Sequence, residues 1–254
     1  MRLLFQYILL FLYSALYVAG LELVRYDRRF WWVVLVSGAV LLFALMWYLC
    51  KRKINWRLLQ FSLAPLIFYV AGFWFAMFLQ RTWIYHTFAI LGAVVFWMYF
   101  EQALLYFHYP LKYFPYTLEN FAYYMGLLAF FFLVSGLFGF AILLQLKVWF
   151  LAVLAALGTF IINFEIFWNQ KIELRKSRIF NFVITLIVVE FFVALGFLPT
   201  GYYVNAAVLS IFYYVLMGLS KSALTGYLTR RSVLMHVFIA AACLLLVLFS
   251  AQWI

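Results

Sequence analysis

The chain has 254 residues, of which 70% are hydrophobic, 24% are aromatic and only 10% are charged. A water-soluble fold cannot bury that much apolar surface, so the composition excludes a soluble enzyme or soluble binding protein. The net charge of +11 would suggest a nucleic-acid partner in a soluble protein. Here the basic residues are spread over short segments between apolar runs, as membrane topology requires, and we expect no nucleic acid as a partner.

Apolar stretches of about 18 residues or more predict membrane-spanning helices, and the sequence contains nine of them. Their ranges are 3–24, 30–50, 58–79, 84–107, 119–144, 148–168, 179–198, 203–220 and 232–252. The segments between them are short, so we expect one integral-membrane domain over residues 1–254 and no soluble domain. The predicted fold class is all-α, a polytopic transmembrane helical bundle.

The basic residues predict the orientation of the bundle, because Lys and Arg near span ends are retained on the cytoplasmic side. Thirteen fall on one side: Arg2, Lys51, Arg52, Lys53, Arg57, Lys112, Lys171, Arg175, Lys176, Arg178, Lys221, Arg230 and Arg231. Five fall on the other: Arg25, Arg28, Arg29, Arg81 and Lys147. We therefore expect the N-terminus inside and the C-terminus outside, in a plasma (cytoplasmic) membrane or its equivalent.

Two further expectations concern the first span and the cysteines. Residues 3–24 could form a cleaved signal peptide, but the apolar region is longer than is usual for one, so a retained helix is preferred. Cys50 and Cys243 fall at different depths of the predicted bundle and should not form a disulfide.

Three glutamates lie within predicted spans, namely Glu101, Glu165 and Glu190. A carboxylate within a bilayer costs about 2.5 to 3.5 kcal/mol, so such a residue usually faces the bundle interior or a wet cavity. Counted along the helices, Glu101 and Glu165 fall roughly 7 and 10 Å to the cytoplasmic side of their span centres, and Glu190 falls near the midplane. The first two are expected to share an inner-leaflet pocket.

Neutral polar residues are the expected partners of these carboxyl groups, because no Lys or Arg lies well inside a span. For Glu101 and Glu165 the candidates are Gln102, Asn163 and Asn169. For Glu190 they are Ser210, Tyr213 and Thr159. Such hydrogen bonds would make the glutamates interhelical ties. The alternative is that they handle protons or bind a ligand.

The stretch 100–120 contains Glu101, His108 and Glu119 between two spans. We expect His108 to end the fourth helix and Glu119 to lie in the first turn of the fifth, where a carboxylate meets the positive end of the helix dipole. The functional alternative is a cytoplasm-facing pocket of these three residues and Glu165 for a divalent metal or a proton relay. No metal-binding spacing such as HExxH accompanies it, so no metal or cofactor is expected.

The sequence offers little support for two other kinds of intramembrane enzyme, a metal-dependent prenyl transferase and a serine–histidine hydrolase. Asp27 is the single aspartate, so the sequence cannot build the aspartate-rich metal sites of prenyl-transferring membrane enzymes. The stretch "GLSK" (Gly218 to Lys221) and His236 could supply a serine and a histidine, but no nucleophile motif surrounds them.

The sequence thus favours a membrane-embedded scaffold or complex subunit without catalysis of its own. It would bind partner membrane proteins or lipids, including anionic headgroups at the cytoplasmic face. A proton- or ion-coupled transporter that uses Glu101, Glu165 and Glu190 is one alternative. A lipid-modifying enzyme that works at the inner interface through Glu101, Glu165 and His108 is another.

Overall fold

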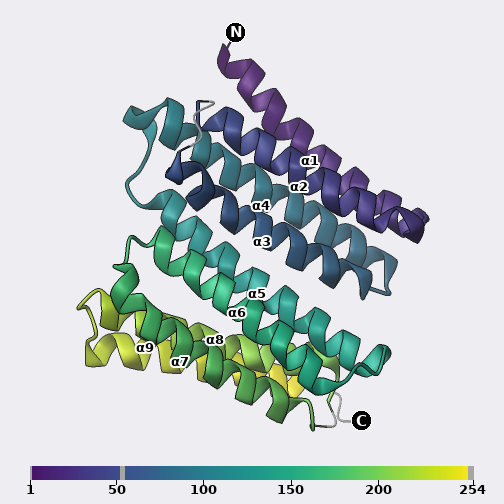
Figure 1. Cartoon of the computed structure of the whole chain (residues 1–254), viewed down its shortest axis with the longest axis vertical. Coiled ribbons are helices and arrows are strands. Elements are labelled where there is room, and N and C mark those ends of the chain that lie inside the picture. Colours follow the sequence, from purple (N-terminus) through teal and green to yellow (C-terminus); the bar gives the residue numbers. More distant parts are fainter. Residues whose placement is uncertain (1, 52–54, 199, 251–254) are drawn as a thin grey trace. The chain divides into compact units, whose positions relative to one another are not determined.

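The computed structural model describes residues 2–51, 55–198 and 200–250, and these residues form helices and short connections without a β-strand (Figure 1). Nine of the described helices are long and apolar enough to cross a membrane. They are α1 (Arg2–Tyr26), α2 (Trp31–Leu49), α3 (Trp56–Met77), α4 (Thr82–His108), α5 (Thr117–Leu143), α6 (Val148–Asn169), α7 (Leu174–Leu195), α8 (Tyr202–Leu224) and α9 (Arg230–Ser250). Short 3-10 helices, η1 (Arg28–Phe30) and η2 (Pro110–Lys112), lie between them. The predicted all-α, multi-pass fold is confirmed.

The largest difference from the predicted spans is at α7, which begins at Leu174 rather than at residue 179. The additional turn contains Arg175, Lys176 and Arg178, whose side chains are exposed. Lys and Arg are good helix formers, and backbone hydrogen bonding continues where the apolar run has stopped. The hydropathy of the sequence thus predicted the part of α7 that can lie in lipid, but it did not predict where the helical hydrogen bonding begins.

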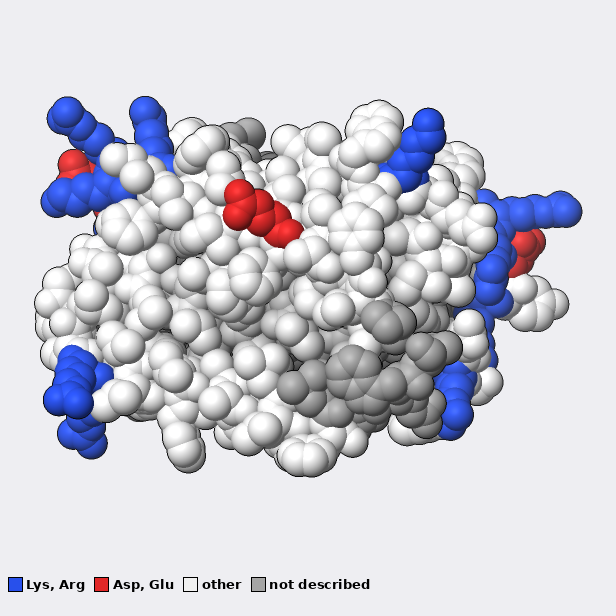
Figure 2. Space-filling view, turned by 90° about the horizontal axis from the view of Figure 1, so that it is seen from below, with Lys and Arg blue, Asp and Glu red and all other residues white. Residues whose placement is uncertain are grey.

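On the face shown in Figure 2, the described Lys and Arg side chains gather toward two opposite edges, and the described surface between them is uncharged apart from a small acidic area. Such a band is expected where helices meet hydrocarbon. Arg52 and Lys53, which entered the basic count, lie outside the described residues. The predicted orientation of the termini stays a prediction.

Contacts divide the chain into two compact units, Met1–Met125 and Gly126–Ile254, with the boundary inside α5. In the first unit α1 packs against α4 and α2, and α2 packs against α3. In the second unit α6, α7, α8 and α9 pack in series. The part of α5 beyond Gly126 contributes Phe130, which stacks on Tyr213 of α8 with ring centroids 3.8 Å apart.

The core of the first unit is aromatic and centres on Phe96 of α4, which is fully buried. Its ring centroid lies 4.9 Å from that of Tyr17, 5.3 Å from that of Phe68 and 5.6 Å from that of Tyr13. All three contacts are edge-to-face, the geometry that the aromatic quadrupole favours. Since no hydrophobic effect drives helices together in lipid, such close packing supplies much of their association.

Pro65 lies inside α3 and is buried, yet the helix is continuous around it. Proline has no N–H, so the carbonyl of Phe61, four residues earlier, lacks its normal helical donor. The hydroxyl of Tyr99 on α4 donates to that carbonyl at 2.6 Å. A neighbouring helix thus satisfies the backbone group that the proline leaves free, which is how membrane helices tolerate such residues.

Candidate functional site

Glu165 of α6 is fully buried within the second unit. Its Oε1 accepts a hydrogen bond from Asn169 Nδ2, one helical turn later, so this predicted partner is confirmed. Its Oε2 has no hydrogen-bond partner among the described residues. A Cβ atom on Gly126 would lie 3.3 Å from Oε2, so the glycine lets α5 pass directly beside the carboxyl group. Glu165 therefore faces protein, as predicted.

Asn163 is bonded to no carboxyl group of the described residues and instead forms the centre of a buried polar network. Its Oδ1 accepts from the Tyr213 hydroxyl of α8 at 2.7 Å, and its Nδ2 donates to Thr185 Oγ1 of α7 at 3.3 Å. Asn181, one turn before Thr185, donates to the Phe160 carbonyl of α6 at 3.2 Å. These bonds join α6, α7 and α8. Asn181 and Thr185 were not among the residues expected from the sequence, although their spacing of four residues places both on one helix face.

Glu190 does not have the partners that the sequence suggested. Its side chain is exposed on α7, and none of the described residues donates to it or forms an ion pair with it. The Tyr213 hydroxyl donates to Asn163, and the Ser210 hydroxyl is buried with no partner in the described part of the chain. The reason is helical geometry. Val188 and Phe192 are buried, and Glu190, two residues from each, points about 200° away from them around the helix axis.

Glu101 and Gln102 are half-buried on α4 in the first unit. Glu101 Oε1 accepts from the Tyr7 hydroxyl of α1 at 3.3 Å, a long interhelical hydrogen bond. His108 ends α4, as predicted, and its Nδ1 is buried with no hydrogen-bond partner among the described residues. Among the described residues the partner shown for Glu101 is thus Tyr7, and no hydrogen bond joins it to His108.

The connection between α4 and α5 is organised by Tyr113. Its hydroxyl accepts from the Leu118 backbone N–H at 2.9 Å and donates to Glu119 Oε2 at 2.8 Å. Burial and the neighbouring Glu119 carboxyl raise the pKa of Tyr113, whereas the hydrogen bond from Leu118 lowers it. Glu119 lies in the first turn of α5, as predicted. The arrangement satisfies an N–H group that the helix start leaves without an intrahelical acceptor.

The described residues show where the side chains considered for a metal centre and for a serine–histidine pair lie. No three His, Cys, Asp or Glu side chains of the described part are close enough to hold a metal ion together. Glu101 belongs to the first unit and Glu165 to the second, so their shared pocket stays a prediction. His236 of α9 shares a hydrogen bond of 3.0 Å with the Tyr214 hydroxyl of α8, and its ring packs against Gly218.

No protein-family model, curated protein or solved structure gives a significant match to this chain. The arrangement of polar groups in the described helices is what bears on its function. That arrangement consists of buried interhelical hydrogen bonds and one carboxyl group, Glu190, that is exposed within an apolar helix.

Proposed function

We propose that this multi-pass membrane protein acts without catalysis of its own, as a membrane-embedded subunit that assembles with a partner membrane protein through the exposed face of α7. The observation that carries the proposal is the position of Glu190. It lies in the apolar part of α7 and none of the described residues binds it.

An exposed carboxyl group at this position conflicts with a lipid environment. Phe182 and Leu186, two turns and one turn before Glu190, are 64% and 46% exposed, so the surrounding face is apolar. A charged side chain in hydrocarbon costs about 2.5 to 3.5 kcal/mol. A partner helix that presents Arg, Lys or an amide donor removes this cost by completing the hydrogen bonds. The α7 face therefore suits a membrane-spanning helix that carries such a donor.

We also infer that the N-terminus is cytoplasmic and that the loop between α6 and α7 meets anionic headgroups. This loop and the first turn of α7 contain Lys171, Arg175, Lys176 and Arg178. Basic residues near an anionic membrane surface contribute about 1 kcal/mol each. A cysteine at Arg175 should be inaccessible to an impermeant reagent added outside intact cells. Strong external labelling would reverse the orientation.

Site-specific photo-crosslinking in the native membrane tests the assembly. A photoreactive residue at Leu186 should form one discrete protein adduct, because Leu186 lies one turn from Glu190 on the same face. Leu157 of α6 is a matched control, since it is 57% exposed on an apolar face without an acidic residue. A crosslinker there should capture lipid only. The adduct at Leu186 should disappear in Glu190→Leu and weaken in Glu190→Gln, which keeps a polar group.

Three results would contradict the proposal. Identical lipid-only adducts at Leu186 and Leu157 would show that α7 has no protein partner. An adduct of unchanged intensity in Glu190→Leu would show that the carboxyl group does not recognise the partner. Proton flux in liposomes that contain only this chain, lost in a stably folded Glu190→Gln variant, would favour the transporter alternative, because an amide cannot bind and release a proton.

A further inference from the structure

An open hollow of about 590 Å³ lies between the start of α7 and the end of α8 in the second unit. Its volume is within the range of small-molecule binding pockets. The two apolar spans have their ends here, at Arg175 and Leu224, so we expect the hollow at the level of the lipid headgroups. The residues that line this α7/α8 hollow are Lys176, Ile179, Phe180, Ala223, Leu224, Thr225 and Gly226.

The lining of the hollow changes from basic to apolar with depth. Lys176 is exposed in the first turn of α7, and Ile179 and Phe180 lie about one turn further into the span. On the opposite wall Leu224 is the last residue of α8, and Thr225 follows it. A ligand that matches this lining has an anionic end beside Lys176 and an apolar part beside Ile179, which is 70% exposed.

The two segments that border the hollow are strongly basic. Residues 171–178 and 221–231 contain seven Lys and Arg and one Glu. That residue, Glu173, forms an ion pair with Lys176 at 3.0 Å, and both side chains are exposed. Exposed ion pairs contribute little to stability, so a phosphate group can replace Glu173 beside the lysine. The first turn of α7 is also the positive end of a helix dipole, which favours an anion.

The carbonyl groups at the end of α8 are bonded within the chain. Gly226 has a φ of +76°, the left-handed conformation that ends many helices. Its N–H donates to the Ala223 carbonyl at 3.3 Å, and the N–H of Tyr227 donates to the Ser222 carbonyl at 2.9 Å. These bonds satisfy acceptors that the end of a helix would otherwise present to an anion.

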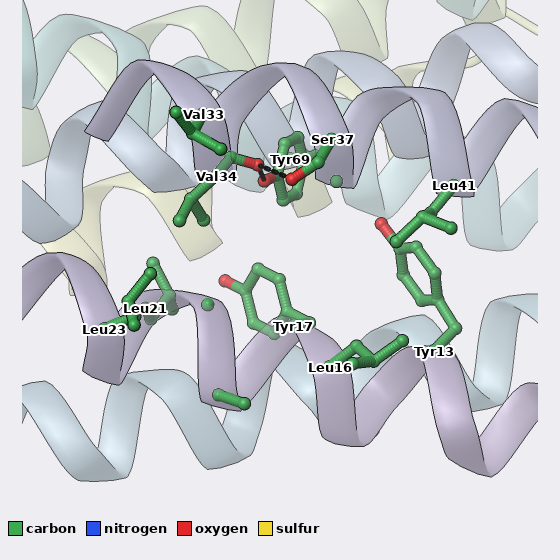
Figure 3. A pocket seen from close by; sticks show the side chains of 13 residues that line it. Tyr13, Leu16, Tyr17, Leu21, Leu23, Val33, Val34, Ser37, Leu41 and Tyr69 are labelled. Carbon is green, nitrogen blue, oxygen red and sulfur yellow. Dashed lines mark hydrogen bonds between the residues drawn. The ribbon is translucent and has the colours of Figure 1, made fainter. Parts of the chain in front are cut away.

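Figure 3 shows a smaller cavity, of about 310 Å³, between α1 and α2 in the first unit. Aliphatic and aromatic side chains line it together with Ser37. None of the described residues that line it is charged. This cavity suits hydrocarbon and has no group that attracts a phosphate, so it serves as a comparison for the α7/α8 hollow.

We propose that the α7/α8 hollow binds one anionic glycerophospholipid, with its phosphate beside Lys176 and its acyl chains against Ile179 and Leu224. The phosphate replaces Glu173 as the counter-ion of the lysine, and the chains stay continuous with the bilayer. The site belongs to the surface that we infer to meet anionic headgroups and rests on that inference. It does not depend on a partner protein at Glu190.

Native mass spectrometry of the intact chain in a neutral detergent, titrated with dioleoyl phosphatidylglycerol, tests the site. We expect one lipid per chain to bind ahead of all others, and more tightly than phosphatidylcholine with the same chains. Lys176→Gln should weaken this first binding step by about 5-fold, which corresponds to about 1 kcal/mol for a basic residue at a membrane surface. Glu173→Gln should strengthen it, because it removes the competing carboxylate.

Two matched controls separate this site from general attraction to the basic surface. Arg178 is exposed two residues after Lys176, about 200° around the helix axis, and does not line the hollow. Arg178→Gln should therefore change the first binding step by less than about 2-fold. Ala223→Trp fills the hollow and should abolish that step, whereas Ala19→Trp, in the cavity of Figure 3, should leave it unchanged. These four side chains are exposed, so the variants should fold normally.

Equal effects of Lys176→Gln and Arg178→Gln would overturn the proposal, because they would show attraction to the surface as a whole. Undiminished binding to Ala223→Trp would also overturn it, as would equal affinity for phosphatidylcholine. Displacement of the lipid by inorganic phosphate would identify a site for the free anion and would be a further contrary result. The assay contains the isolated chain, so it does not depend on orientation in the cell. External labelling of a cysteine at Arg175 would refute the orientation alone.

Discussion

Substitution of Tyr99 by Phe should destabilise the first unit more than the loss of an ordinary interhelical hydrogen bond. The Tyr99 hydroxyl donates to the Phe61 carbonyl at 2.6 Å, and both residues are buried. Because Pro65 cannot donate to that carbonyl, the substitution removes the donor that takes the place of the missing proline N–H. A buried polar group left unsatisfied costs about 1 to 3 kcal/mol, which is about a 5- to 160-fold change in the unfolding equilibrium.

The effect should depend on the proline. In a Pro65→Ala background the alanine N–H can bond to the Phe61 carbonyl, and the cost of Tyr99→Phe should fall to about 0.6 kcal/mol, the average for side-chain hydrogen bonds between membrane helices. The two substitutions should therefore show a coupling free energy of roughly 1 kcal/mol. Equilibrium unfolding in mixed detergent and SDS micelles, with helicity measured by circular dichroism, gives the four free energies of the cycle.

Tyr85→Phe is the matched control. Tyr85 is also on α4, is also buried, and its hydroxyl donates to the Leu21 carbonyl of α1. The residue four positions after Leu21 is Arg25, which has an N–H, so this carbonyl keeps its helical donor. Tyr85→Phe should cost about 0.6 kcal/mol in both backgrounds. An equal cost of Tyr99→Phe with and without Pro65 would refute the explanation.

Three further outcomes are expected. Glu165→Gln should change the free energy of unfolding by less than about 1 kcal/mol, because glutamine keeps an acceptor for Asn169. Glu165→Leu removes that acceptor and should cost about 1 to 3 kcal/mol. Equal costs of the two variants in the same SDS titration would contradict a role for the hydrogen bond. Tyr213→Phe should cost about 1 kcal/mol by removing the donor to Asn163, and an unchanged stability would show that the bond contributes nothing. Burial raises the pKa of Cys50 to about 12. At about pH 8 a maleimide should therefore label Cys50 only after denaturation, because the thiolate is the reactive form. Rapid labelling of Cys50 in the folded protein would contradict this expectation.

The sequence was sufficient to predict those features that depend on residues close together in the chain. Span positions follow from runs of apolar residues, because a helix that crosses hydrocarbon must be apolar along its whole length. The end of α4 at His108 and the place of Glu119 in the first turn of α5 also follow from local rules for helix ends. Asn169 lies one turn from Glu165, so their hydrogen bond could be anticipated from spacing alone.

The sequence was insufficient to predict a hydrogen bond or packing contact whose partner lies on another helix. The apolar residues of a membrane helix surround it on all sides, so hydropathy does not distinguish a face toward protein from a face toward lipid. For this reason Glu190 was expected inside the bundle, and the network around Asn163 was not anticipated.

What the sequence determined by itself is the class of molecule, an all-α multi-pass membrane protein, since composition and the length of apolar runs depend on no contact between helices. Only the tertiary structure decided that Tyr99 satisfies the carbonyl freed by Pro65, that Asn163 bonds to α7 and α8, and that Glu190 faces outward. Each of these depends on how a helix is rotated about its own axis, and that rotation is set by side-chain packing against its neighbours.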